Sequence, residues 1–293
     1  MELRALRYLQ TLALEGSVSN AAKSLHITQP TLSRQLSALE AELGCELFER
    51  SYRGMSLNDN GMMLLRYADS ILELVEKAEC DLSPSGSTVA GPIYIGAGET
   101  MNMVYIARAM ELLRCEHPGI DLRLSSGSTV DLMDGFVRGA YDFLIECEVG
   151  SHVEANVLDL PIQDRWGVLV KRGSELAERD SFTPVDLIGR EVILPRQALG
   201  NSTLRKWAGD ALDQCTVVAQ FSLPLNAALI SRCNYVPMLT YEGLFEVSDD
   251  SDMTFIPLSP ELRSKQGLLW RKIRLSRQAE LFLEALKCAI AEQ

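Results

Sequence analysis

The chain has 293 residues, 47% of them hydrophobic, so it can bury more than one core and its length suggests roughly two domains. Its apolar runs fall far short of the roughly 18 residues that a membrane helix needs, and no basic segment followed by an apolar stretch opens it. We therefore expect a cytoplasmic protein with no membrane partner. The seven cysteines lie far apart without a C-x-x-C pair, which predicts reduced thiols and no metal site.

The net charge of −12 would disfavour a polyanionic partner if it were spread evenly along the chain. It is not spread evenly. Residues 1–58 carry six cations and six anions, whereas the rest of the chain carries 22 cations and 34 anions. The composition therefore excludes a protein that is basic throughout, but it does not exclude nucleic acid as a partner of the amino-terminal part.

Apolar spacing predicts three short helices at the beginning of the chain. The first helix ends at Gly16, and Ser19 is the expected N-cap of the second. The third helix should begin with Thr28 as its cap and Pro30 in its first turn, and it should end at Gly44. Its apolar stripe consists of Leu32, Leu36, Leu39 and Leu43.

This stripe directs the opposite, polar face of the third helix to solvent. The following segment, LFERSYRGMSL, predicts a two-stranded ribbon with a basic tip. Three helices and a basic hairpin are the plan of a winged helix-turn-helix, in which the start of the third helix enters the major groove and the wing holds phosphates. A polar face that is merely solvated is the alternative. The expected DNA-binding residues are Gln29, Pro30, Thr31, Ser33, Arg34, Arg50 and Arg53.

Residues 16–61, GSVSNAAKSLHITQPTLSRQLSALEAELGCELFERSYRGMSLNDNG, resemble the amino-terminal domain of the LysR-type transcriptional regulators. The family patterns AA-x-x-L-x-x-[ST]-Q-P-[AST]-[LV]-S and LE-x-x-LG-x-x-LF-x-R are both present. Where the family has Thr-x-Ala-Gly, this sequence has Asn58-Asp59-Asn60-Gly61. The resemblance implies a transcriptional regulator that binds double-stranded operator DNA, with RNA polymerase as a further expected partner.

Residues 59–83 are expected to form one long linker helix, because no glycine or proline interrupts residues 62–82. Apolar residues recur there at alternating spacings of four and three, as in a coiled-coil seam. Packing of this helix on its own chain is the alternative. The resemblance implies a homodimer or homotetramer formed through the helix. The run Ser83-Pro84-Ser85-Gly86-Ser87 predicts a hinge, at 84–90. The expected dimerisation residues are Leu64, Ala68, Ile71, Val75 and Ala78.

From residue 91 to residue 293, strand-like runs alternate with helical patterns, which predicts an α/β domain with mostly parallel strands. In such sheets, ligands bind at the carboxyl ends of strands, where helix amino termini offer N–H groups to anions. Gly98-Glu99-Thr100 and Gly127-Ser128-Thr129 both follow a predicted strand and precede a predicted helix.

The resemblance extends over this region and implies a periplasmic-binding-protein-like (type 2) effector domain. Subdomain I would comprise 91–161 and 267–293, and subdomain II 162–266, with a cleft for a small-molecule effector between them. No cofactor is expected. Ordinary helix capping is the alternative role for each hydroxyl, and Glu99 would disfavour a carboxylate unless its side chain points to solvent. The expected effector-binding residues are Thr100, Met101, Gly127, Ser128, Thr129, Ser202 and Thr203.

Together these parts predict an α+β multidomain chain with a winged helix-turn-helix at 1–58 and an effector domain at 91–293. Catalysis has little support, because no nucleophile elbow, P-loop or G-x-G-x-x-G surrounds the three histidines, His26, His117 and His152. The rival hypothesis is an α/β solute-binding or enzymatic domain fused to a DNA-binding module. A catalytic dyad in the cleft would favour it.

Overall fold

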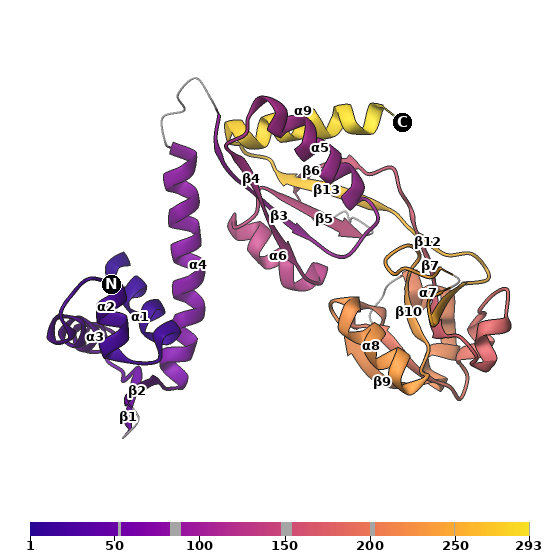
Figure 1. Cartoon of the computed structure of the whole chain (residues 1–293), viewed down its shortest axis with the longest axis horizontal. Coiled ribbons are helices and arrows are strands. Elements are labelled where there is room, and N and C mark those ends of the chain that lie inside the picture. The colour runs from indigo at the N-terminus through magenta and orange to yellow at the C-terminus, as the bar shows by residue number, and fades with distance from the viewer. Residues whose placement is uncertain (52–53, 83–88, 148–153, 200–202, 249, 293) are drawn as a thin grey trace. The chain divides into compact units, whose positions relative to one another are not determined.

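The structure is a computed structural model that describes residues 1–51, 54–82, 89–147, 154–199, 203–248 and 250–292. The chain divides into two compact units, Met1–Pro84 and Ser85–Gln293 (Figure 1). Within the described ranges, no helix combines the length and the apolar character needed to span a bilayer.

The first unit contains three helices, a hairpin and a long helix, in the predicted order. Ser17, not the predicted Ser19, caps the second helix, because its Oγ accepts a hydrogen bond from Asn20 N at 3.2 Å. In chain order the elements are α1 (Leu3–Glu15), α2 (Val18–Ser24), α3 (Gln29–Leu43), β1 (Phe48–Ser51), β2 (Gly54–Leu57) and α4 (Asp59–Leu82).

Leucines from α1 and α3 form the core of this unit. Leu32, Leu36 and Leu39 of the predicted stripe are at most 2% exposed, which fixes the orientation of α3. Leu43 is 40% exposed, so its predicted burial is wrong. The reason is its position as the last residue of α3, beyond the end of the core.

Helix α4 contributes to the same core. Ala68 is fully buried and Leu72 is 8% exposed, and Ile71 packs against them. The amino-terminal part of the predicted dimerisation seam, with Leu64, Ala68 and Ile71, therefore packs on its own chain, which was the alternative interpretation. A different face of α4 is open to solvent, with Met63 48% and Tyr67 60% exposed.

The second unit contains two sheets. The first has the order β4-β3-β5-β13-β6, and β3 runs parallel to β4 and β5. Strand β13 pairs antiparallel with β5 and β6. The bounds are β3 (Gly91–Ala97), β4 (Ile120–Ser126), β5 (Phe143–Cys147), β6 (Ala155–Asp159) and β13 (Gln266–Arg271).

Helices cover both faces of this sheet. Successive side chains of a strand point to opposite faces, so neighbouring residues contribute to different cores. Phe143 packs in one core with helices α5 and α9, and its neighbour Leu144 packs in another core with α6. This makes a three-layer arrangement (Figure 1). The helices are α5 (Met103–Glu116), α6 (Thr129–Arg138) and α9 (Arg277–Ala291), close to the predicted ranges.

The second sheet has the order β11-β7-β10-β8-β9, with the short β12 also paired to β7. Strand β8 is parallel to β9 and β10, whereas β7 is antiparallel to all its partners. The strands are β7 (Asp164–Lys171), β8 (Glu191–Pro195), β9 (Thr216–Phe221), β10 (Met238–Tyr241), β11 (Met253–Pro257) and β12 (Arg263–Ser264). The α-helices described in this part of the chain are α7 (Thr203–Ala208) and α8 (Pro224–Asn234).

The expectation of mostly parallel strands is wrong. Strand β7 is the first strand of the second sheet, and β13 is the last strand of the first sheet. Each of these two strands begins just after the chain crosses from one sheet to the other. Neither is therefore reached through a βα connection, and both pair antiparallel with their neighbours. The short strands β6, β11 and β12 were not predicted.

Candidate DNA-binding face and effector cavity

The start of α3 is fixed by contacts within its own segment. The Thr28 Oγ1 accepts a hydrogen bond from Thr31 N at 3.4 Å, and the two threonine hydroxyls are 2.8 Å apart. Pro30 occupies the first turn, where its missing N–H leaves no gap in the helix. The helix therefore begins abruptly at Gln29, as its sequence predicts.

The predicted DNA-binding residues of α3 lie on the surface of the first unit. Gln29, Pro30 and Arg34 are exposed, and Thr31 and Ser33 are half-buried. Ser19 Oγ of α2 donates to Gln29 Oε1 at 3.1 Å, a contact that uses the amide oxygen and not the amide nitrogen. It fixes the position of Gln29 at the leading end of the helix.

The wing has the predicted hairpin form, with Phe48 opposite Leu57 and Ser51 opposite Gly54. The backbone of Arg50 belongs to β1. Its side chain, and all of Arg53, lie outside the described residues. Glu40 of α3 anchors the hairpin, because its Oε1 accepts hydrogen bonds from Leu47 N at 2.8 Å and Phe48 N at 3.3 Å.

The junction between the wing and α4 is closed by Asn58 and Gly61. Asn58 Oδ1 accepts from Gly61 N at 2.9 Å, and its Nδ2 donates to Glu46 O at 2.9 Å. A Cβ at Gly61 would lie 2.2 Å from Leu47 O, so only glycine fits there. The Asn-x-x-Gly sequence at this point therefore begins α4 and holds it against the hairpin.

The second unit contains a cavity of about 320 Å³ between residues of its two sheets. Of the predicted effector-binding residues, Gly127 and Thr203 line it. Thr100, Met101 and Ser128 are not among the lining residues. The side chain of Thr129 and the whole of Ser202 lie outside the described residues.

Thr100 and Met101 instead bind a carboxylate of the chain itself, that of Asp164. Thr100 Oγ1 donates to Asp164 Oδ2 at 2.5 Å, and Met101 N donates to Asp164 Oδ1 at 3.1 Å. Gln266 Nε2, from the lining of the cavity, donates to Asp164 Oδ2 at 3.0 Å. Burial raises the pKa of Asp164 above its usual value, although these three hydrogen bonds act in the opposite direction.

Neighbouring side chains at these turns are also engaged. Asn102 exchanges hydrogen bonds with the backbone of Ile162 at 2.8 and 3.0 Å. Ser128 caps α6, since its Oγ accepts from Asp131 N at 3.4 Å and donates to the Asp131 carboxylate at 2.6 Å. Helix capping is thus the observed role of Ser128. Asp164 was not predicted, because its one signal in the sequence is an acid at the start of a buried apolar strand.

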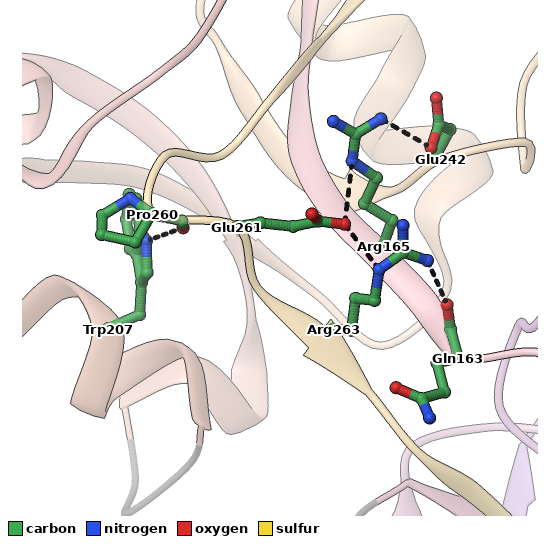
Figure 2. A network of polar contacts seen from close by, with 7 residues as sticks. All are labelled: Gln163, Arg165, Trp207, Glu242, Pro260, Glu261 and Arg263. Carbon is green, nitrogen blue, oxygen red and sulfur yellow. Dashed lines mark hydrogen bonds and ion pairs between the residues drawn. The ribbon is translucent and has the colours of Figure 1, made fainter.

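Arg165, the residue after Asp164, lies in a separate polar network (Figure 2). Its guanidinium is 3.5 Å from the Glu242 carboxylate and 3.6 Å from that of Glu261. Glu261 also accepts from Arg263 Nε at 2.5 Å. Figure 2 shows the Arg165 side chain held between the two glutamates, so its charge is compensated there and not at Asp164.

Aromatic side chains form much of the cavity wall. The rings of Trp166 and Tyr241 meet edge to face, with centroids 4.4 Å apart. Trp166 Nε1 donates to Ser264 Oγ at 2.8 Å, which satisfies its one polar group and fixes the indole ring. Among the described residues that line the cavity, Glu99 is the one charged side chain, and it is exposed.

Comparison with known families decides what the two units are. Residues 3–62 match the family described as bacterial regulatory helix-turn-helix protein, lysR family, and residues 86–291 match the LysR substrate binding domain. The chain belongs to the LysR family of transcriptional regulators. The two matched regions of this LysR-family regulator correspond to its two compact units.

Individual relatives agree with this assignment. YusT of Bacillus subtilis (strain 168), an uncharacterized HTH-type transcriptional regulator, is 38% identical over 149 residues, so the match spans only half of either chain, 50% of each. A probable RuBisCO transcriptional regulator of Emiliania huxleyi is 34% identical, over 75% of this chain and 69% of the relative. The crystal structure of full-length CbnR with its target DNA has the same fold, with a TM-score of 0.72 at 20% identity, over 99% of this chain and 100% of CbnR.

As a member of the LysR family, the chain has a DNA-binding helix-turn-helix domain and a domain that binds a small molecule. The relatives are named as transcriptional regulators, which is consistent with a protein that is not an enzyme. The hypothesis of an enzymatic domain fused to a DNA-binding module receives no support from them.

Proposed function

We propose that this LysR-family regulator acts in the cytoplasm, binds an operator in duplex DNA through α3 and the wing, and changes that binding when a small-molecule effector occupies the cavity of the second unit. The exposed polar start of α3 carries the DNA part of this proposal. The Gln29 amide can pair with adenine and the Arg34 guanidinium with guanine in a major groove. Contact with RNA polymerase stays a prediction from the family resemblance.

A binding titration of the full chain on operator and scrambled duplexes, at several salt concentrations, tests the DNA part. Gln29→Ala should weaken operator binding by about 1 to 3 kcal/mol and leave scrambled DNA almost unaffected, because it removes a hydrogen-bonding group that reads a base. Gln35→Ala, an exposed glutamine on another side of α3, is the matched control and should change neither affinity. An equal loss on both duplexes with Gln29→Ala would contradict a role in base recognition.

The wing should hold the DNA without reading its sequence. Replacing Arg53 by Ala should weaken binding to both duplexes alike, because a cation on a hairpin tip is expected to bind phosphate. It should also flatten the slope of log K against log salt by about one unit for each phosphate that is no longer neutralised. A loss confined to the operator would assign base recognition to the wing instead.

The effector part of the proposal rests on the cavity. Val130 of α6 lines the cavity and is 76% exposed, so Val130→Trp places a large ring there with little expected effect on folding. We expect this variant to bind DNA normally and to lose its response to whichever metabolite, in a panel, alters protection of the operator. Val137→Trp, at a 64% exposed position of the same helix that does not line the cavity, is the control.

We infer that two copies pair through α4, as a homodimer or as half of a homotetramer, using the face with Met63 and Tyr67. These side chains are exposed and Leu74 on the same face is half-buried, whereas Ala68 is used by the chain's own core. Tyr67→Asp should separate the copies in light scattering without unfolding the protein, because it buries unpaired charge only in the paired state. Ile71→Asp should instead destabilise each copy. If Ile71→Asp separates the copies and Tyr67→Asp does not, the dimer interface is the predicted seam that contains Ile71.

A further inference from the structure

The cavity of the second unit is apolar and acidic in character. Trp166, Phe221 and Tyr241 give it three aromatic walls. No lysine or arginine lines it among the residues that the structure describes, and Glu99 does. In the described part of the second unit, the charged side chains that are buried are Asp142, Glu146 and Asp164, all of them acids.

At one turn beside this cavity, the polar groups that would ordinarily receive an anion are already in use. The turn between β3 and α5 precedes a helix amino terminus, the usual place for an anionic ligand in a parallel sheet. Its hydroxyl, on Thr100, and its N–H, on Met101, both donate to Asp164. An incoming carboxylate would have to displace Asp164 or do without these donors.

The charge of Asp164 is not compensated locally. Its side chain is 1% exposed, its three hydrogen-bond donors are neutral groups, and no ion pair joins it in the described part of the chain. Successive side chains of a strand point to opposite faces, so Asp164 shares a face of β7 with Trp166 of the cavity wall. Arg165 points the other way, toward Glu242 and Glu261 (Figure 2). In its ionised form, Asp164 therefore favours a cation over an anion beside this wall of the cavity.

We propose that the effector of this regulator is a small organic cation, an amine with an aromatic or otherwise apolar body, and not a carboxylate. The inference rests on the proposed effector role of the cavity. Its aromatic walls suit an apolar body and attract a cation through their ring faces, and Glu99 supplies the opposite charge in the lining. Asp164, which accepts a hydrogen bond from the lining residue Gln266, lies beside it. A carboxylate would meet the acid Glu99 in the lining and no free donor pair at the turn after β3.

Three probes of the same carbon skeleton test the charge preference: phenethylamine, phenethyl alcohol and phenylacetate. Titration calorimetry on the full chain at neutral pH should give the lowest dissociation constant for phenethylamine and the highest for phenylacetate. Glu99→Gln should weaken phenethylamine binding by about twofold to fivefold, the range for an exposed ion pair. Glu284→Gln, at an exposed position of α9 outside the cavity lining, is the matched control and should leave all three constants unchanged.

Asp164→Asn should reduce the preference for phenethylamine over phenylacetate further. If this variant fails to fold, Glu99→Gln decides alone, because an exposed side chain is dispensable for folding. Phenylacetate binding as tightly as phenethylamine, in a manner that Val130→Trp abolishes, would overturn the charge assignment and leave the effector site intact. Binding that ignores Val130→Trp, or no binding by any of the three probes, would reject the site and the inference together.

Discussion

The amino-terminal ends of α3 and α5 each have a threonine that accepts a local hydrogen bond, but only the threonine before α5 is also bound to a distant carboxylate. Helix α3 is capped by Thr28, three residues from the N–H that it accepts, and the side chains that follow remain on the surface. The turn before α5 also has a threonine, Thr100, whose hydroxyl accepts locally from Asn102 N at 3.2 Å but donates to Asp164, 64 residues further along the chain. Whether a hydroxyl at the start of a helix can donate to a ligand therefore depends on a distant residue, which the local sequence pattern does not show.

Removing the distant partner should have the largest effect. Asp164→Ala leaves the donors of Thr100, Met101 and Gln266 without their buried acceptor, and an unsatisfied buried group costs about 1 to 3 kcal/mol. We expect the free energy of unfolding, measured by urea denaturation, to fall by about 2 kcal/mol or more. A decrease of only a few tenths would show that the end of α5 does not depend on Asp164.

Removing the local cap of α3 should have a smaller effect. Thr28→Ala should lower the free energy of unfolding by about 1 kcal/mol, because one helix N–H loses its acceptor. Thr11→Ala is the matched control, since the Thr11 hydroxyl only donates to Arg7 O inside α1 and its removal should be nearly neutral. If both variants unfold at the same urea concentration, the Thr28 cap contributes nothing measurable.

Thr100→Val distinguishes the structural role of this hydroxyl from a direct role in effector binding. It removes one donor to Asp164 and the acceptor of Asn102 N at nearly constant volume, so the free energy of unfolding should fall by about 0.5 to 1.5 kcal/mol for each hydrogen bond lost. Phenethylamine affinity should change little. Unchanged stability combined with weaker effector binding would instead place Thr100 in contact with the ligand, as the family resemblance suggests.

The smallest effect concerns pH. Burial raises the pKa of Asp164 in the folded state above its unfolded value, so the folded state binds the proton more tightly. This contribution to stability is fully present below the unfolded pKa and is lost as pH rises through the folded pKa. The free energy of unfolding of the wild type, relative to Asp164→Asn, should therefore decrease from acid to neutral pH in denaturant titrations. A relative increase would mean that the hydrogen bonds outweigh burial.

The sequence predicted the first unit well because its determinants are close together along the chain. The Thr28 cap, Pro30, the leucine stripe and Gly44 all act within one helix, and the elements appear where they were expected. The strands and helices of the second unit that have long apolar runs were also predicted. Strands β6 and β11 were missed, because each mixes positions of different exposure and has no long apolar run to mark it.

The candidate sites were predicted less completely, for the same physical reason. Gly127 and Thr203 line the cavity, but so do Trp166, Phe221 and Tyr241, which come from strands whose meeting point no local pattern encodes. On α4, the periodicity found an apolar stripe but could not say whether it packs on its own chain, and Ala68 does. The expected roles of Arg53, Thr129 and Ser202 remain predictions.

The junction at Asn58 and Gly61 fixes the rotation of α4 about its axis relative to the wing and α3. Only Asn58 separates the end of the wing from the start of α4, and its side-chain hydrogen bonds with Glu46 O and Gly61 N hold the two segments together. One residue inserted here would turn the rest of α4 by about 100° about its axis. The side of the helix offered to a second copy would then no longer match the direction in which α3 faces, so this junction would set the relative phase of the two half-sites on an operator.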